Sequence, residues 1–173
     1  STLMKILCGA YTKDAGMIRV ADDVVHIDNP HRAQELGISI IYQEFNLTPN
    51  QTVAANIFIA REPKAKGLGG LLGFVDKSYM EAEAQKLLKR VGARVPPYAK
   101  VRQLSVAQQQ MVEIAKSLAF NARIIVMDEP TSALGEEEVE VLFQIIQNLK
   151  QQGIAVIFIS HRLEEIMRIA DRV

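Results

Sequence analysis

The sequence predicts an α/β fold in which a parallel sheet carries helices on both faces, with a small antiparallel β piece and an inserted α-helical subdomain. From Ser105 onwards, helical and strand-like patterns alternate, as they do in folds built from parallel strands and crossover helices. The strand-like segments are short apolar runs rich in β-branched residues, which is typical of strands buried on both faces. The helical character of residues 47–100 favours the inserted subdomain.

The N-terminal segments predict a short helix followed by an antiparallel pair of strands. The patterns place the helix at residues 1–7 and the strands at 17–20 and 24–27. Asn29 and Pro30 supply a cap and a first-turn proline for a second short helix, which Gly37 ends. A buried strand is predicted at 38–42, and Cys8, which lies among apolar residues, is expected to pack in the core.

Two helices are predicted in the middle of the chain, at residues 53–61 and 77–91. Asp76 is the expected cap of the second helix, and Gly92 follows its end. The buried face of that helix is expected to comprise Tyr79, Ala82, Leu87 and Leu88. Residues 63–73 hold four glycines and are expected to form a mobile surface loop. The next helix opens with Lys77 and Ser78, but no glycine directly precedes that lysine. The loop therefore does not match G-x-x-x-x-G-K-S/T and is not expected to bind phosphate.

Polar side chains follow three of the predicted strands at their carboxyl ends. Gln43 follows the strand at 38–42, Asp128 and Glu129 follow the strand at 124–127, and His161 follows the strand at 154–159 and opens a helix. Ligands gather at this edge of parallel sheets. Nucleotide hydrolysis needs one carboxylate near Mg²⁺ and another near the attacking water, and the two acidic residues can supply both. Each segment taken alone also fits an ordinary turn or helix start.

A fourth polar element is the helix that Ser105 caps and that continues to Leu118. Its free backbone N–H groups and the serine hydroxyl suit an anionic phosphate group. An ordinary serine cap without a ligand fits the same residues. The amphipathic helix at 136–151 completes the predicted alternation.

Composition limits the classes of partner. Twenty Lys and Arg balance twenty Asp and Glu, so no overall positive field is present to gather nucleic acid, and no nucleic-acid partner is expected. A single cysteine excludes an internal disulfide. His26 and His31 lack metal-ligand spacing and are expected to be solvated. No apolar stretch approaches the ~20 residues that cross a bilayer, and a cytoplasmic location is expected.

Four motifs in order resemble those of ABC ATPases. Gln43 matches the Q-loop, residues 104–110 (LSVAQQQ) the signature, residues 124–134 (IIVMDEPTSAL) the Walker B motif with the D-loop, and His161 the H-loop. The resemblance implies a P-loop NTPase core at 1–45 and 121–173 and a helical subdomain at 46–120. Val106 and Ala107 stand where the signature usually has two glycines, and Gly135 replaces an acidic or hydroxyl residue common after the D-loop.

The resemblance also implies roles for these residues, with ATP and Mg²⁺ as cofactors. Asp128 would hold Mg²⁺ through water, Glu129 would polarise the attacking water, His161 would hold the γ-phosphate, and Gln43 would connect the metal with a membrane partner. The signature residues that would contact ATP bound to a neighbouring domain are Ser105, Val106, Ala107 and Gln108. An ATPase activity coupled to transport is therefore expected.

Ser1 and Thr2 resemble the end of the phosphate-binding loop G-x-x-x-x-G-K-S/T, with Ser1 as a Mg²⁺ ligand. The glycines and the lysine of that loop do not precede them. The fold is therefore expected to be incomplete at both ends, and this chain alone is expected to bind ATP poorly and to be inactive.

Three segments most resemble the first ATPase domain of monosaccharide importers: residues 42–47, 52–57 and 108–116. That resemblance implies a membrane permease, a second ATPase domain in the same polypeptide and, indirectly, a periplasmic sugar-binding protein as partners, with the domain on the inner face of the membrane. Importers of nucleosides or signalling sugars stay open. A non-transport ABC ATPase in DNA repair, chromosome structure or translation is the alternative, although no long heptad arm or basic face is evident.

Overall fold

Three parallel strands form the central sheet of the computed structural model, which describes residues 2–65 and 75–173. The strands are β3 (Ile38–Ile41), β4 (Ile124–Asp128) and β5 (Ala155–Ile159), in the order β3-β4-β5. Ile38 pairs with Ile124, and Ile124 pairs with Ala155. The prediction of a parallel sheet is confirmed. The carboxyl ends of the three strands consequently meet at one edge.

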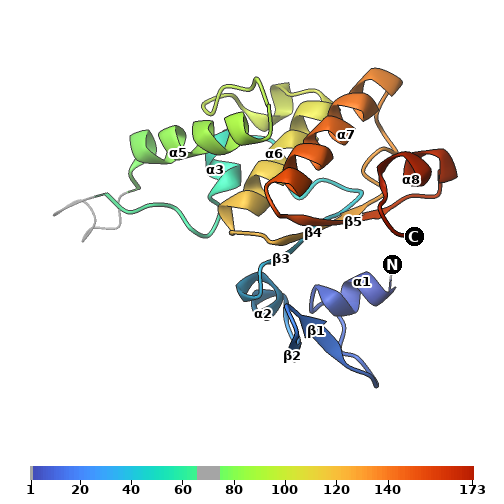
Figure 1. The fold of residues 1–173 in the computed structure, drawn as a ribbon. Helices are drawn as coiled ribbons and strands as arrows, with labels where there is room; N and C mark the ends of the chain where they lie inside the picture. The colour runs from blue at the N-terminus through green and yellow to red at the C-terminus, as the bar shows by residue number, and fades with distance from the viewer. Residues whose placement is uncertain (1, 66–74) are drawn as a thin grey trace.

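Alternate side chains of the sheet pack against two different layers, because successive residues of a strand point to opposite faces. One face contributes Ile41, Ile125, Met127, Val156 and Phe158 to a core shared with the C-terminal helices. The other face contributes Ile38, Ile40, Ile124, Val126, Ile157 and Ile159 to a core shared with the N-terminal segments. Figure 1 shows the helices α6 and α7 on one side of β4 and the helix α1 on the other. Coverage of both faces was predicted and is confirmed.

The N-terminal layer consists of two helices and the predicted antiparallel pair. Its elements are α1 (Thr2–Leu7), β1 (Ile18–Val20), β2 (Asp23–Val25) and α2 (Pro30–Glu35). Asn29 caps α2 as expected, since its Oδ1 accepts a 2.8 Å hydrogen bond from the backbone N–H of Arg32. Cys8 is buried in this layer. Ser1 and residues 66–74, which include most of the predicted glycine loop, lie outside the described residues.

Helices α3 (Val53–Ile57), α5 (Lys77–Arg90) and α6 (Val106–Ala119) pack together, and the 3-10 helix η1 (Val101–Gln103) leads into α6. Asp76 caps α5 by accepting from the N–H of Tyr79. The predicted buried face of α5 is confirmed at Leu88 but is wrong at Tyr79, which is 54% exposed. The buried residues of α5 are Met80, Ala84 and Leu88. The observed stripe follows the i, i+4, i+8 spacing of one helix face.

The helix α3 ends four residues earlier than the predicted boundary at Arg61. Ala60 has a φ of +63°, a left-handed conformation that a continuing right-handed helix does not contain. Helices α7 (Glu136–Gln151) and α8 (Leu163–Ile169) complete the described fold. None of the helices within the described ranges has both the length and the apolar character needed to span a bilayer.

Gly9 joins α1 to the rest of the N-terminal layer through a close backbone approach. It has a φ of +74°, and a Cβ at this position would lie 2.3 Å from the carbonyl carbon and oxygen of Asn29. Because those atoms belong to the backbone that caps α2, they cannot move aside as a flexible side chain would. The contact requires glycine for two reasons, its φ and its lack of a side chain.

We expect Gly9→Ala to lower the free energy of unfolding by about 2–4 kcal/mol, since it adds a steric clash to an unfavourable φ. Gly16→Ala is the matched control, because Gly16 has a φ of +90° and no heavy atom within 4 Å of its added Cβ. The control is expected to lose only about 1 kcal/mol. Urea unfolding measures both, and equal losses would show that the close approach to Asn29 contributes nothing.

Candidate functional site

Asp128 and Glu129 lie at the carboxyl end of β4, beside the end of β5. Asp128 pairs with Ile159 in the parallel register, and the backbone N–H of Glu129 donates a 2.9 Å hydrogen bond to the carbonyl of Ile159. Glu129 has a φ of +48°, a left-handed conformation that costs a non-glycine residue about 1–3 kcal/mol. Such strain persists only where surrounding contacts hold it, so the turn after β4 is a tightly determined piece of backbone.

His161 lies beside Glu129, delivered by the end of β5. Its Nδ1 is 3.4 Å from Oε1 of Glu129. Both side chains can reach a ligand, since 66% of His161 and 34% of Glu129 are exposed. His161 also lines a groove of about 820 Å³ between the start of α7 and α8. The structure therefore brings these two predicted site residues together, whereas their chemical roles stay predictions.

The prediction that His161 opens a helix is wrong, because α8 begins at Leu163 with Arg162 as its N-cap residue. The hydroxyl of Ser160 accepts a 3.0 Å hydrogen bond from the backbone N–H of Arg162. This bond holds a bend between β5 and α8. His161 projects from that bend rather than from a helical turn.

Two polar residues that the sequence analysis did not single out, Thr131 and Glu165, lie close in sequence to Glu129 and His161. Oγ1 of Thr131 donates a 2.8 Å hydrogen bond to Oε2 of Glu165, and both residues are buried. The spacing of Arg162 and Glu165 could have drawn attention to Glu165, because an acidic residue three positions after a helix cap is a common first-turn arrangement. That spacing gives no indication of the long-range partner Thr131.

Gln43 lies just past the end of β3 and is exposed. The preceding residue, Tyr42, is half-buried, and its pKa is raised by burial and then by the nearby Cys8 and Asp128. Ile41 pairs with Met127 in the parallel register, so Tyr42 lies beside Asp128 and Gln43 follows at the same edge of the sheet. Within the described part of the chain, no hydrogen bond joins Gln43 to Asp128 or Glu129.

Burial raises the pKa of the Cys8 thiol to about 11, which makes this cysteine an inert packing residue.

The predicted cap at Ser105 is confirmed. Oγ of Ser105 accepts a hydrogen bond from the N–H of Gln108, and Oε1 of Gln108 accepts one from the N–H of Ser105. This reciprocal pair uses the serine hydroxyl within the chain. Among the residues that the structure describes, no hydrogen bond or ion pair joins Ser105 to Glu129 or His161. Val106 is exposed at 37% and Ala107 is half-buried.

Within the described ranges, no hydrogen bond or ion pair joins Thr2, His26 or His31 to Glu129 or His161. Thr2 is exposed at the start of α1. His26 and His31 are exposed, and Nδ1 of His31 lies 3.3 Å from Oε1 of Glu35. Neither histidine belongs to a group of three or more metal-ligating side chains in the described ranges.

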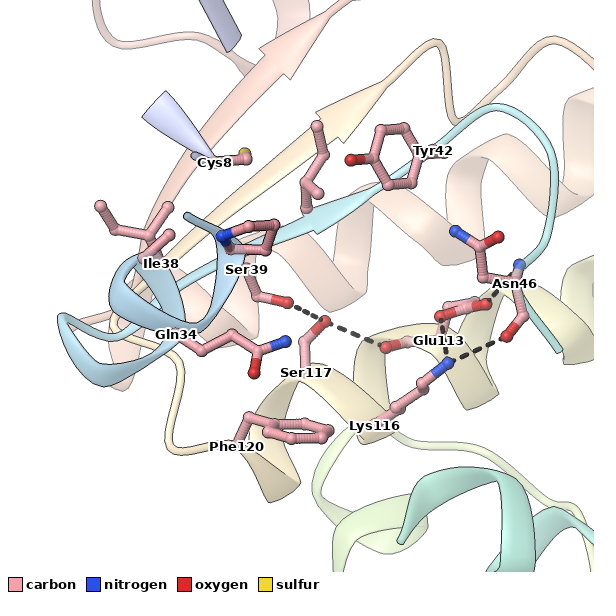
Figure 2. Close-up of a pocket in the computed structure, with 13 residues that line it drawn as sticks. Cys8, Gln34, Ile38, Ser39, Tyr42, Asn46, Glu113, Lys116, Ser117 and Phe120 are labelled. Atoms are coloured by element: carbon pink, nitrogen blue, oxygen red, sulfur yellow. Dashed lines mark hydrogen bonds and ion pairs between the residues drawn. The ribbon is translucent and has the colours of Figure 1, made fainter. Parts of the chain in front are cut away.

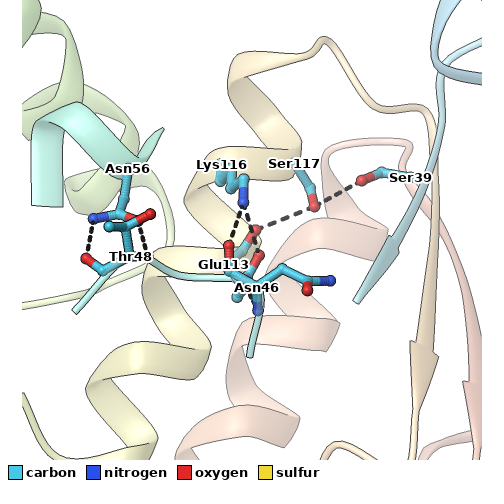
Figure 3. Close-up of polar contacts among 7 residues, drawn as sticks. All are labelled: Ser39, Asn46, Thr48, Asn56, Glu113, Lys116 and Ser117. Atoms are coloured by element: carbon cyan, nitrogen blue, oxygen red, sulfur yellow. Dashed lines mark hydrogen bonds and ion pairs between the residues drawn. The ribbon is translucent and has the colours of Figure 1, made fainter. Parts of the chain in front are cut away.

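A polar clamp joins α6 to the segment that follows Gln43. Oε1 of Glu113 accepts a 2.9 Å hydrogen bond from the N–H of Asn46, and Nζ of Lys116 donates a 2.9 Å hydrogen bond to the carbonyl of Asn46. Figure 3 shows both bonds, together with the contact of the Ser39 and Ser117 hydroxyls that ties β3 to α6. Two side chains of α6 thus bind both the N–H and the carbonyl of Asn46, three residues after Gln43.

The same residues line a cavity of about 210 Å³ between α2, β3 and α6. Figure 2 shows Cys8 and Tyr42 at one end of it and Glu113 with Lys116 at the other. Burial raises the pKa of Glu113, and the charge of Lys116 and the hydrogen bond from Asn46 oppose that rise only in part. Neither Glu129 nor His161 lines the cavity. Its lining residues Tyr42, Asn46 and Glu113 belong to the contacts that hold the backbone around Gln43.

Comparison with known proteins identifies the relatives of this chain. A family model described as "ABC transporter" matches residues 1–132. The chain is 50% identical over all its 173 residues to the ribose import ATP-binding protein RbsA 2 of Streptomyces coelicolor, of which it covers 32%. It is 51% identical to the ribose import ATP-binding protein RbsA 1 of Rubrobacter xylanophilus, of which it covers 34%. The chain thus spans about a third of the length of these relatives.

Solved structures share the fold. The ADP conformation of MJ1267, an ATP-binding cassette of an ABC transporter, superposes with a TM-score of 0.80 at 25% identity, over 98% of this chain and 68% of the other. The ATP-binding cassette MJ0796 bound to ADP and Pi has a TM-score of 0.69 at 24% identity, over 95% of this chain and 70% of the other. The α/β core with its parallel sheet therefore has the architecture of these cassettes.

The buried carboxyl group of Glu113 predicts a pH dependence of stability. A pKa raised in the folded state means that the protonated group favours folding, and this contribution is lost as the pH rises from the unfolded value near 4.5 through the folded pKa. Glu113→Gln keeps an oxygen that can accept from Asn46 and does not ionise. We therefore expect the stability of the variant relative to the parent chain to increase between pH 4.5 and neutrality.

Urea unfolding at a series of pH values measures this difference. Glu137→Gln removes the same charge from an exposed position of α7 and serves as the control, for which no such increase is expected. A stability difference for Glu113→Gln that stays constant or decreases with rising pH would contradict the assigned burial effect.

Proposed function

Because this chain belongs to the ABC transporter family, we propose that it forms part of the ATP-hydrolysing domain of an importer for a monosaccharide or a related small solute. The observation that carries the proposal is the pair of the half-buried Glu129 and the exposed His161, 3.4 Å apart at the carboxyl edge of a parallel sheet. The printed names of the relatives at about 50% identity support import rather than a non-transport role. They also support a sugar as the transported solute.

The proposed chemistry assigns one task to each side chain at the edge. The carboxylate of Glu129 accepts a hydrogen bond from the attacking water and directs it towards the γ-phosphate. Nδ1 of His161 faces Glu129, so Nε2, on the other side of the ring, is the nitrogen that can donate to a phosphate oxygen. Gln43, exposed at the same edge, is proposed to connect the metal with a membrane partner.

A magnesium ion fits the donor set at this edge. Asp128 offers a half-buried carboxylate, and Mg²⁺ is commonly held by one or two carboxylates together with waters and substrate phosphates. Asp128 would hold the ion through water, with Ser1 and Gln43 as further oxygen ligands. When bound, the ion neutralises charge on the phosphates.

The signature residues are proposed to act on nucleotide bound to a second ATPase domain. Within this chain, no described hydrogen bond or ion pair joins Ser105 to Glu129 or His161, which supports a role outside the chain's own site. The relatives are about three times as long as the chain, which supports a second domain in the same polypeptide. A membrane permease, and indirectly a periplasmic sugar-binding protein, are the further proposed partners, with the domain on the inner face of the membrane.

The first test concerns binding and turnover of ATP. We expect the complete polypeptide, assembled with its permease, to hydrolyse ATP with Mg²⁺, and Glu129→Gln to lower the turnover number by at least about 100-fold while ATP binding is kept, because the amide cannot polarise water as a carboxylate does. Glu137→Gln is the control.

Equilibrium binding of labelled ATP and release of phosphate measure the two properties separately. Turnover by Glu129→Gln equal to that of the parent would remove Glu129 from the proposed mechanism. Uptake of labelled ribose or galactose into vesicles containing the assembled protein tests the transport role, and hydrolysis that no sugar stimulates would favour a non-transport ATPase.

A further inference from the structure

Glu165 is a buried carboxylate with three partners. It lies in the first turn of α8 and is only 7% exposed. Its Oε2 accepts 2.8 Å hydrogen bonds from the hydroxyls of Thr131 and Ser160, and its Oε1 lies 3.2 Å from Nη1 of Arg162. A charged group removed from water is destabilising unless hydrogen bonds and an opposite charge replace its hydration. These three contacts satisfy both oxygens.

The partners of Glu165 come from the two loops that carry the proposed catalytic side chains. Thr131 is two residues after Glu129, in the turn that leaves β4. Ser160 immediately precedes His161, in the bend that leaves β5, and its hydroxyl also accepts a hydrogen bond from the N–H of Arg162. A single oxygen atom, Oε2 of Glu165, therefore binds both loops.

We propose that Glu165 is a positioning residue for ATP hydrolysis, holding the loops of Glu129 and His161 at a fixed separation. The inference rests on the proposed function of that pair. Glu165 acts only through Thr131 and Ser160. It lines the same groove as His161, although only 7% of the residue is exposed.

The strained backbone of Glu129 explains why the turn after β4 needs a second hydrogen bond to hold it. The hydrogen bond from Glu129 N–H to the carbonyl of Ile159 fixes the start of the turn, and the left-handed φ of Glu129 favours relaxation towards another conformation. The bond from Thr131 to Glu165 fixes the other side of the same turn. Without it, Glu129 is free to rotate away from the attacking water, and displacements near 1 Å at a reacting group reduce rates by about 100-fold.

The test uses the complete polypeptide assembled with its permease and measures the single-turnover rate constant of ATP hydrolysis. That constant is independent of the fraction of protein that is folded, so general destabilisation does not lower it. We expect Glu165→Gln to lower it about 10-fold, because a neutral amide oxygen accepts the bonds from Thr131 and Ser160 more weakly than a carboxylate does. The dissociation constant for Mg-ATP is expected to change by less than about threefold. Glu164→Gln, which removes the same charge from an exposed neighbour, is expected to match the parent.

Thr131→Val provides a second variant if Glu165→Gln does not fold. It removes only the hydroxyl that donates to Glu165, and the same selective loss in the single-turnover constant is expected. The double variant is expected to lose no more than Glu165→Gln alone, because both changes break one connection.

Three outcomes separate the possibilities. If Glu165→Gln and Thr131→Val both hydrolyse bound ATP at the parent rate, the positioning role is wrong. If their losses multiply in the double variant, the two residues act independently and the shared tie is wrong. If Glu129→Gln retains the parent rate, the proposed function of the site fails, and that result is distinct from either of the others.

Discussion

The parallel pairing of β3, β4 and β5 is the constraint on which the rest of the structure depends. Its register sets Asp128 opposite Ile159, so that the residues that follow the two strands leave the sheet side by side. Nothing local to either segment brings Glu129 within 3.4 Å of His161. The alternation of apolar side chains fixes this register in turn, because a slip by one residue would exchange the faces that pack against α6 and α7 and against the N-terminal layer.

Two buried carboxylates extend the influence of the sheet to its loops. Glu113, on α6, binds the backbone after Gln43, and Glu165, on α8, binds the turns after β4 and β5. Both give up hydration and regain hydrogen bonds to groups that would otherwise be loosely held. Each carboxylate therefore fixes the conformation of a loop at the carboxyl edge of the sheet. These contacts hold the loops that carry the exposed residues Gln43 and His161.

Much of the fold followed from patterns that act over a few residues. Asn29, Asp76 and Ser105 cap helices as expected, because capping depends on a side chain and a backbone N–H two or three positions later. The predicted end of α3 was wrong, and the predicted face of α5 was right at Leu88 but wrong at Tyr79. The left-handed conformation of Ala60 after α3 could not be predicted, because the residue is neither glycine nor proline. Tyr79 and Met80 have similar apolar character, and the packing of α5 against other helices decided which of them is buried.

The sequence by itself determined the order of the elements, the parallel arrangement of the strands and the identity of the polar residues at their ends, because apolar periodicity and capping are encoded locally. The tertiary structure decided which of those residues meet. It brought Glu129 to His161 and Glu165 to Thr131 and Ser160, whereas the described bonds of the Ser105 side chain are local to its own helix. Contacts between distant segments depend on the register of the sheet and on the packing of helices over it, and no short stretch of sequence contains that information.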